Sequence, residues 1–402
     1  MNVANVNLER VTIEGVAPEI DFGNYPIKRA VGESVVVEAD IFTDGHDALH
    51  AALLVREEKA GTWTELPMKF LLNDRWRADF TTSEIGRYFY TIQAWIDRFS
   101  SWRRDLQKKL DAGQAEPVDL LIGVQLIEEA AQRSSGADAT KLRQAATALR
   151  DTKLAESNDL ARILTSDLAE LVNRYPDKHL VTRYAKELSV VVDPAKARFS
   201  AWYEMFPRST AAKAGAHGTL KDCEQRLSYI ASMGFDVLYL PPIHPIGQSH
   251  RKGKNGVLSA SDADPGSPWA IGSRDGGHKA IHAQLGTLDD FARLVKKARE
   301  HHIDIALDIA FQCSPDHPYV TEHPQWFRWR PDKTIQYAEN PPKKYQDIYP
   351  LEFSGDQAGE LWQELKSVIS YWVGHGVRIF RIDNPHTKPF PFWQWVIEET
   401  KK

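Results

Sequence analysis

The sequence contains few cysteines, no long apolar run and no excess of positive charge, and each shortage excludes a class of protein. Its two cysteines, Cys223 and Cys313, are too few for a disulfide framework and favour a reducing compartment. No apolar run is long enough to cross a bilayer, and the N-terminus lacks a basic segment followed by an apolar one. The 50 Lys and Arg against 55 Asp and Glu give a formal net charge of −5, without a basic footprint for nucleic acid. We therefore expect a cytoplasmic protein that contacts neither membranes nor nucleic acids.

Aromatic residues are plentiful. They make up 10% of the 402 residues and include 12 Trp. Trp and Tyr offer flat surfaces that suit sugar rings, although core packing is the commoner use of any single one. The length predicts two or three domains.

Residues 1–98 read as β structure, and the pattern changes to helical at about Phe99. Short alternating strands separated by turn residues predict a β-sandwich. A helical period then runs over 99–176, and strand character returns within 177–194. We interpret 99–176 as a helical-bundle insertion into a sandwich that 177–194 completes. The strands are expected at 34–42, 48–57, 74–80, 86–97 and 186–194.

From residue 195 onward, apolar strands alternate with amphipathic helices, which predicts a parallel sheet. Four strand–helix units fit into 195–402, whereas a complete (β/α)8 barrel needs eight. We favour the first half of such a TIM barrel over a smaller open sheet. The strands are expected at 199–207, 236–245, 303–311 and 377–384, and the helices at 219–234, 287–302, 359–376 and 391–402.

Two connections, 246–286 and 312–358, are too long for simple loops. Both follow strand C-terminal ends, the edge at which barrel enzymes assemble their active sites. The second connection, 312–358, is rich in Trp and Tyr and is interpreted as a loop subdomain.

The strand at 377–384 places Arg381 and Asp383 two residues apart, and therefore on one face. Asp383 would point into a barrel mouth, and Arg381 would favour its ionised form. A rigid, ionised carboxylate suits a nucleophile in glycosyl transfer, although an ion pair that closes the strand explains the spacing equally well. Asp308 lies within an apolar strand and needs a partner, for which Arg381 is suited. For Asp308 a structural role is favoured over a chemical one.

Asp308, followed later by the Arg381-x-Asp383 pair, resembles conserved regions of the α-amylase superfamily (glycoside hydrolase family 13). Longer strings, at 268–287, 312–318, 339–350 and 380–390, together resemble the GlgE-type α-1,4-glucan:maltose-1-phosphate maltosyltransferases. The resemblance covers essentially the whole chain as the N-terminal portion of such a protein. Gln312 and Cys313 stand where many amylase relatives have Asn and His, a departure that is typical of the maltosyltransferases.

The resemblance implies a role for each matching residue. Asp383 would be the nucleophile that forms a β-maltosyl ester. The donor, α-maltose 1-phosphate, would contact Lys252, Gln312, Asp347 and Asn384. Its phosphate would lie near Asn340, Lys343 and Tyr345, since a phosphate leaving group needs cations and hydroxyl donors. On sequence spacing alone, Lys343 would read as a solvated loop residue.

The resemblance also implies the reaction. Maltosyl would pass to the non-reducing end of an α-1,4-glucan such as glycogen, phosphate would be released, and two inversions would retain the α configuration. No metal or cofactor is expected, and the sandwich with its insertion is expected to form a homodimer. The general acid/base Glu would follow a fifth strand, so we expect this polypeptide alone to show no turnover.

Two alternatives remain open. An α-glucan hydrolase or trehalose-forming isomerase of the same superfamily is opposed by the predicted phosphate cluster, because a hydrolase has no phosphate to bind. A non-catalytic glucan-binding homologue is opposed by the intact nucleophile motif.

Overall fold

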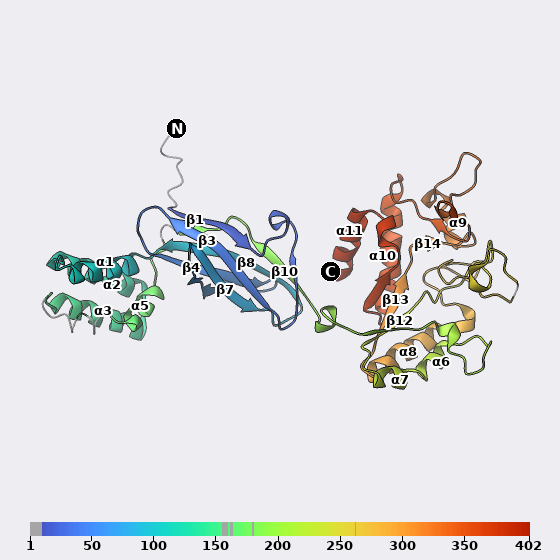
Figure 1. Ribbon diagram of the computed structural model, residues 1–402, viewed down its shortest axis with the longest axis horizontal. Coiled ribbons are helices and arrows are strands. Elements are labelled where there is room, and N and C mark those ends of the chain that lie inside the picture. Colours follow the sequence, from blue (N-terminus) through green and yellow to red (C-terminus); the bar gives the residue numbers. More distant parts are fainter. Residues whose placement is uncertain (1–9, 155–159, 161–163, 179–180, 262) are drawn as a thin grey trace. The chain divides into compact units, whose positions relative to one another are not determined.

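The computed structural model describes residues 10–154, 160, 164–178, 181–261 and 263–402. The chain divides into two compact units, one up to Arg198 and the other Phe199–Lys402. Figure 1 shows a β-rich region with a group of helices in the first unit and alternating strands and helices in the second. Each unit is described by itself.

The first unit contains two sheets (Figure 1). One has the order β1-β3-β7-β6 and is antiparallel; its strands are β1 (Val11–Ala17), β3 (Ser34–Thr43), β7 (Arg75–Thr81) and β6 (Lys69–Phe70). The other has the order β2-β10-β8-β4-β5, with β9 on β8; its strands are β2 (Ile27–Ala30), β10 (Leu188–Asp193), β8 (Gly86–Ile96), β4 (Leu49–Glu57), β5 (Thr64–Pro67) and β9 (Thr182–Arg183). Only the β2–β10 pair of this second sheet is parallel.

The alternation of apolar residues explains how the two sheets pack. Along β3, Val35, Val37, Ala39 and Ile41 are buried, whereas the residues between them are partly exposed. Successive side chains of a strand point to opposite faces, so one face of β3 enters the core. Buried residues of both sheets belong to one hydrophobic cluster, which is the arrangement of a sandwich.

Four described helices lie between β8 and β9 in the sequence and share a separate apolar core. They are α1 (Arg98–Asp111), α2 (Pro117–Arg133), α3 (Gly136–Asp151) and α5 (Ser166–Asn173). Gly123 of α2 allows close packing, because a Cβ there would lie 2.0 Å from Cζ2 of Trp102 on α1. Part of the helical period that we predict before residue 165 falls on 155–159 and 161–163, outside the described residues.

The second unit is built on a parallel sheet of four strands in the order β11-β12-β13-β18. The strands are β11 (Trp202–Glu204), β12 (Val237–Leu240), β13 (Asp304–Ile309) and β18 (Ile379–Ile382). The helices are α6 (Leu220–Glu224), α7 (Leu227–Ser232), α8 (Leu288–Glu300), α9 (Pro318–Glu322), α10 (Ala358–Gly374) and α11 (Phe390–Lys401). The connection after β13 adds two small antiparallel pairs: β14 (Gln312–Cys313) with β17 (Tyr349–Pro350), and β15 (Ala338–Asn340) with β16 (Lys343–Tyr345).

Local chemistry accounts for the element boundaries in this unit. Helix α8 begins after Thr287, whose side chain and that of Asp290 form a capping box. Strand β12 ends at Leu240, earlier than predicted, because the two prolines that follow lack an N–H for the ladder. The prediction of one helix over 219–234 was wrong: a tight turn separates α6 from α7, in which the N–H of Arg226 bonds to the carbonyl of Cys223.

Over the described part of the chain, no helix combines the length and apolar character that a bilayer span requires.

Candidate active-site cleft

A cleft of about 860 Å³ opens at the C-terminal ends of the strands of the second unit. The connections that follow β11, β12, β13 and β18 all contribute to its wall, as the parallel sheet predicts. Seven residues that the sequence singled out line it: Lys252, Gln312, Asn340, Tyr345, Asp347, Asp383 and Asn384.

Asp383 follows directly after β18 and is tied to the neighbouring strand, since its N–H donates to the carbonyl of Ile309 at 2.9 Å. The next residue, Asn384, turns the chain with a left-handed backbone (φ 45°) and donates from Nδ2 to Asp383 Oδ2 at 3.2 Å. The Asp383 carboxylate is 17% exposed, so it is accessible from the cleft although mostly enclosed. This gives a carboxylate on a fixed backbone at the cleft wall.

Arg381 bridges two carboxylates with one nitrogen. Its Nη1 donates to Asp383 Oδ1 at 2.6 Å and to Asp308 Oδ2 at 3.1 Å. Asp308 and Arg381 are also direct partners in the β13–β18 register. The predicted Asp308–Arg381 pair is therefore confirmed. Asp383 lines the cleft, whereas Arg381 is not among the residues that line it.

Asp308 is the most enclosed member of this group, with a side chain that is 0% exposed. Burial raises its pKa to about 6, although hydrogen bonds and the Arg381 charge act in the opposite direction. Besides Arg381, Oδ2 accepts from Tyr239 Oη at 2.5 Å and from Trp269 Nε1 at 3.4 Å. The sequence did not reveal these two partners, because they lie on other segments of the chain.

Lys252 and Asp347 meet across the cleft wall. Lys252 Nζ lies 3.8 Å from Asp347 Oδ1, beyond hydrogen-bond distance, and 5.7 Å from the ring centre of Tyr345. Asp347 is buried, and its Oδ1 accepts no hydrogen bond from the described residues. Burial raises the pKa of Asp347, and the Lys252 charge opposes this rise. A carboxylate oxygen in this position is suited to a hydroxyl donor from a ligand.

Gln312 and the β15–β16 hairpin complete the wall. Gln312 is buried, and its Nε2 donates to the carbonyl of Trp269 at 3.1 Å. Asn340 and Tyr345 lie on the two strands of the hairpin and reach the cleft. Lys343 pairs with Asn340 in the hairpin but is exposed and does not line the cleft. Its predicted contact with phosphate therefore stays a prediction.

Several lining residues were not predicted from the sequence. They are Phe206, Arg208 and Trp269, together with His386 and Thr387 after the nucleophile candidate. Phe206 and Arg208 come from the connection after β11, residues 205–219, where the sequence pattern indicated only an alternation of strand and helix.

A buried histidine cluster is formed by His244 and His278, from the connection after β12, and His317, from the connection after β13. The N–H of Tyr319 donates to His317 Nδ1 at 3.0 Å, which places the proton of this ring on Nε2. Nε2 can then donate to His278 Nδ1 at 3.1 Å, and His278 Nε2 donates to the Ala310 carbonyl at 2.9 Å. Burial lowers the pKa of His244 to about 3, of His278 to about 4 and of His317 to about 2. These rings are therefore neutral structural groups at pH 7.

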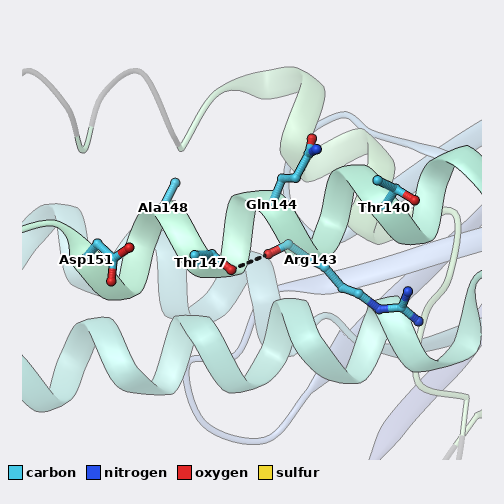
Figure 2. A pocket seen from close by; sticks show the side chains of 6 residues that line it. All are labelled: Thr140, Arg143, Gln144, Thr147, Ala148 and Asp151. Carbon is cyan, nitrogen blue, oxygen red and sulfur yellow. Dashed lines mark hydrogen bonds between the residues drawn. The ribbon is translucent and has the colours of Figure 1, made fainter.

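A second hollow lies on the outer face of α3 in the first unit (Figure 2). All six of its lining residues belong to this one helix: Thr140, Arg143, Gln144, Thr147, Ala148 and Asp151. The Thr147 hydroxyl is used locally, since it donates to the Arg143 carbonyl at 3.0 Å.

Within the described ranges, no three His, Cys, Asp or Glu side chains converge as a metal site. The cleft of the second unit is therefore the candidate active site.

Comparison with known proteins gives two family matches. Residues 9–194 match the model described as α-1,4-glucan:maltose-1-phosphate maltosyltransferase, domain N/S. Residues 202–388 match the α-amylase catalytic domain.

Proteins named α-1,4-glucan:maltose-1-phosphate maltosyltransferase are similar over nearly the whole chain. The relative from Chlorobaculum tepidum is 51% identical over 96% of this chain and 58% of its own length. The relative from Methylacidiphilum infernorum is 49% identical over 98% of this chain and 59% of its own. The relative from Myxococcus xanthus is 50% identical over 98% of this chain and 60% of its own length. The chain thus spans about three fifths of the length of these relatives, and its two parts are similar, in order, to domain N/S of the α-1,4-glucan:maltose-1-phosphate maltosyltransferases and to the α-amylase catalytic domain.

Proposed function

We propose that the cleft binds α-maltose 1-phosphate and that its maltosyl group passes to the non-reducing end of an α-1,4-glucan with release of phosphate. The observation that carries this proposal is the position of Asp383, held by Arg381 and open to a cleft with Lys252 and Asp347. The relatives' shared name supports the choice of donor and acceptor.

In this reaction Asp383 attacks the anomeric carbon, and the bond from that carbon to the phosphate oxygen breaks. The product is a β-maltosyl ester of Asp383 and free phosphate. The 4-hydroxyl of the acceptor then attacks the ester carbon and releases Asp383, which restores the α configuration. Arg381 stabilises the carboxylate before attack and after release. A general acid/base must serve both steps, and the resemblance assigns it to a Glu after a fifth barrel strand.

We assign donor recognition to two kinds of side chain, hydrogen-bond acceptors and a cation. Asp347 and Gln312 offer acceptors to sugar hydroxyls, and Lys252 offers a cation. Asn384 orients Asp383 and contacts the donor. The hairpin residues Asn340, Lys343 and Tyr345 are proposed to contact the phosphate.

We further propose that the four parallel strands are the first half of a (β/α)8 barrel. Their order follows the chain without reversal, whereas a doubly wound sheet reverses it at a switch point. Within the described residues, β11 and β18 each pair with one strand only, which leaves an edge for further strands.

The helical insertion into the sandwich is proposed to form a homodimer surface in a cytoplasmic enzyme. Helix α2 exposes Val118, Leu121 and Ile122, whose spacing puts them on neighbouring turns. Replacing Leu121 by Asp is expected to convert the dimer to a monomer in light scattering, whereas Ala in its place has a smaller effect. A monomeric unmodified protein would refute this part.

The function is tested on the full-length gene product with 2-deoxy-2-fluoro-α-maltosyl fluoride. Fluoride is a good leaving group, and the 2-fluoro substituent slows ester hydrolysis, so the intermediate accumulates. We expect one added fluoromaltosyl group, on the peptide that contains Asp383. Asp383→Ala removes the labelling, and Asp332→Asn, at an exposed carboxylate of the same unit, retains it.

Product analysis distinguishes the alternatives. Incubation with α-maltose 1-phosphate and glycogen is expected to release phosphate and lengthen glucan chains by maltosyl units. Free maltose or trehalose as the main product would favour the hydrolase or isomerase. Glycogen binding without labelling or phosphate release would favour the non-catalytic homologue.

A further inference from the structure

The segment that presents Lys252 to the cleft is fixed by a residue outside the cleft. Asp316, in the connection after β13, does not line the cleft but accepts three hydrogen bonds from this segment, residues 248–252. Its Oδ2 accepts from the N–H groups of Gln248 and Ser249 at 2.6 and 2.7 Å. Its Oδ1 accepts from the Ser249 hydroxyl at 2.7 Å. Burial would raise the pKa of Asp316, but these bonds outweigh it and the pKa is lowered, so the carboxylate is ionised at neutral pH.

The same two segments are also in close steric contact. A Cβ on Gly247 would lie 2.4 Å from Cβ of Ser314 and 3.2 Å from Asp316 Oδ2. Ser314 in turn donates from its N–H to the Ile271 carbonyl at 2.7 Å and from Oγ to the Gly272 carbonyl at 2.6 Å. Residues 314–316 therefore contact the connection after β12 at two places, 247–249 and 271–272.

The side chain of Arg251 stiffens the segment from within. Its guanidinium donates to the carbonyls of Ile246 and Gly247 at 3.1 and 2.9 Å, and to that of Asp264 at 3.1 Å. His250 has a left-handed backbone (φ 54°), so the chain turns sharply between the Asp316 contacts and Lys252. Lys252 follows Ser249 by only three residues, and a change of the anchored backbone therefore reaches it directly.

We propose that Asp316 is a positioning residue for donor binding, which fixes the 248–252 segment so that Lys252 faces Asp347 across the cleft. A carboxylate is suited to this role because its two oxygens accept from two backbone N–H groups and a hydroxyl together. Without it, the segment gains conformations, and binding a donor must order them again at an entropic cost. The proposal rests on the proposed function, because it concerns the same site.

The test is a double-mutant cycle in the full-length gene product, with KM and kcat measured for α-maltose 1-phosphate. Asp316→Asn places an NH2 group against backbone donors and is expected to raise KM roughly tenfold, with kcat changed about twofold or less. Lys252→Ala is expected to raise KM by at least as much. If Asp316 acts through Lys252, the double variant has the KM of Lys252→Ala to within about twofold. A KM that multiplies the two single effects, or a normal KM in Asp316→Asn, would overturn the proposal.

Asp222→Asn is the matched control, because Asp222 also accepts a backbone N–H and a hydroxyl, both from Thr219, at 2.8 and 2.7 Å. It is expected to lower thermal stability without raising KM. An equal rise of KM in this control would show that general destabilisation is the cause. Should Asp316→Asn fail to fold, Ser249→Ala removes one of the three bonds and is expected to raise KM about two- to threefold.

Hydrogen exchange separates this proposal from the proposed function. Asp316→Asn is expected to accelerate exchange at the amides of Gln248 and Ser249 at least tenfold, whichever reaction the protein performs, and Lys252→Ala is expected to leave it unchanged. Fast exchange in Asp316→Asn with no phosphate released by the unmodified protein would refute the proposed function, and the anchoring of residues 248–252 by Asp316 would still hold. Phosphate release with unchanged exchange and unchanged KM would sink the positioning role alone.

Discussion

Replacing Arg381 by Met tests how much the ion pairs of Arg381 with Asp308 and Asp383 contribute to the stability of the fold. The guanidinium is the one cation bonded to buried Asp308 among the described residues, and it is shared with Asp383. Met keeps most of the apolar stem and removes the charge. The hydrogen bonds of Asp308 then come only from the neutral donors Tyr239 and Trp269 among the described residues, while the nearby Asp383 carboxylate disfavours its ionisation.

The structure sets the size of the effect. Burial already raises the pKa of Asp308 to about 6 with Arg381 present, so holding it ionised costs about 3 kcal/mol relative to water. Breaking a buried pair by removing one partner typically costs about 3–5 kcal/mol. Arg381 is 41% exposed, which screens its charge, so we expect Arg381→Met to lower the free energy of unfolding by about 2–3 kcal/mol at pH 8.

The pH dependence identifies the responsible group. The folded-state pKa of Asp308 lies above its unfolded value, so its ionisation destabilises the fold increasingly as pH rises from about 4 through the folded pKa. Losing Arg381 raises that pKa further. The difference between Arg381→Met and the unmodified protein should therefore be large at pH 8 and small at pH 5.

Urea unfolding of the second unit, followed by circular dichroism at both pH values, measures this difference. Adding Asp308→Asn to Arg381→Met removes the unpaired carboxylate and should recover at least half of the stability lost at pH 8. The reasoning is refuted if the destabilisation is the same at pH 5 and pH 8, or if Asp308→Asn makes Arg381→Met still less stable.

Three further outcomes follow from the packing. Because the folded pKa values of the buried histidine cluster lie below the ordinary value near 6.5, stability is full above pH 6.5 and falls by about 2 kcal/mol per histidine at pH 5, as urea midpoints should show. Gly123→Ala should destabilise the helical bundle by about 1–3 kcal/mol despite better helix propensity, because Trp102 occupies the space; a stabilised bundle in thermal unfolding would contradict this. Thr287→Ala should cost about 1 kcal/mol by removing the cap of α8, and Thr287→Ser should restore it.

The local sequence accounted for much of the second unit. The strand predicted at 303–311 is observed as Asp304–Ile309, and the helix predicted at 287–302 as Leu288–Glu300. Both follow from short-range chemistry: an apolar run for a buried parallel strand, and a Thr–Asp capping box for the helix start. The break between α6 and α7 was missed because its residues carry no Gly or Pro signal.

The sequence by itself singled out the candidate side chains of the proposed reaction. The period of two put Arg381 and Asp383 on one face, and a buried Asp308 required a cation. The family resemblance added Lys252, Gln312 and Asp347 as candidates.

Only the tertiary structure decided how these groups are held. Tyr239 and Trp269 reach Asp308 from 69 and 39 residues away, and Asp316 anchors Gln248 across 68 residues. The same packing leaves Lys343 outside the cleft wall although its hairpin partner Asn340 lines it. Such contacts depend on how long connections fold back over the strand ends. Local periodicity carries no information about that path, because loop closure and packing against distant segments set it.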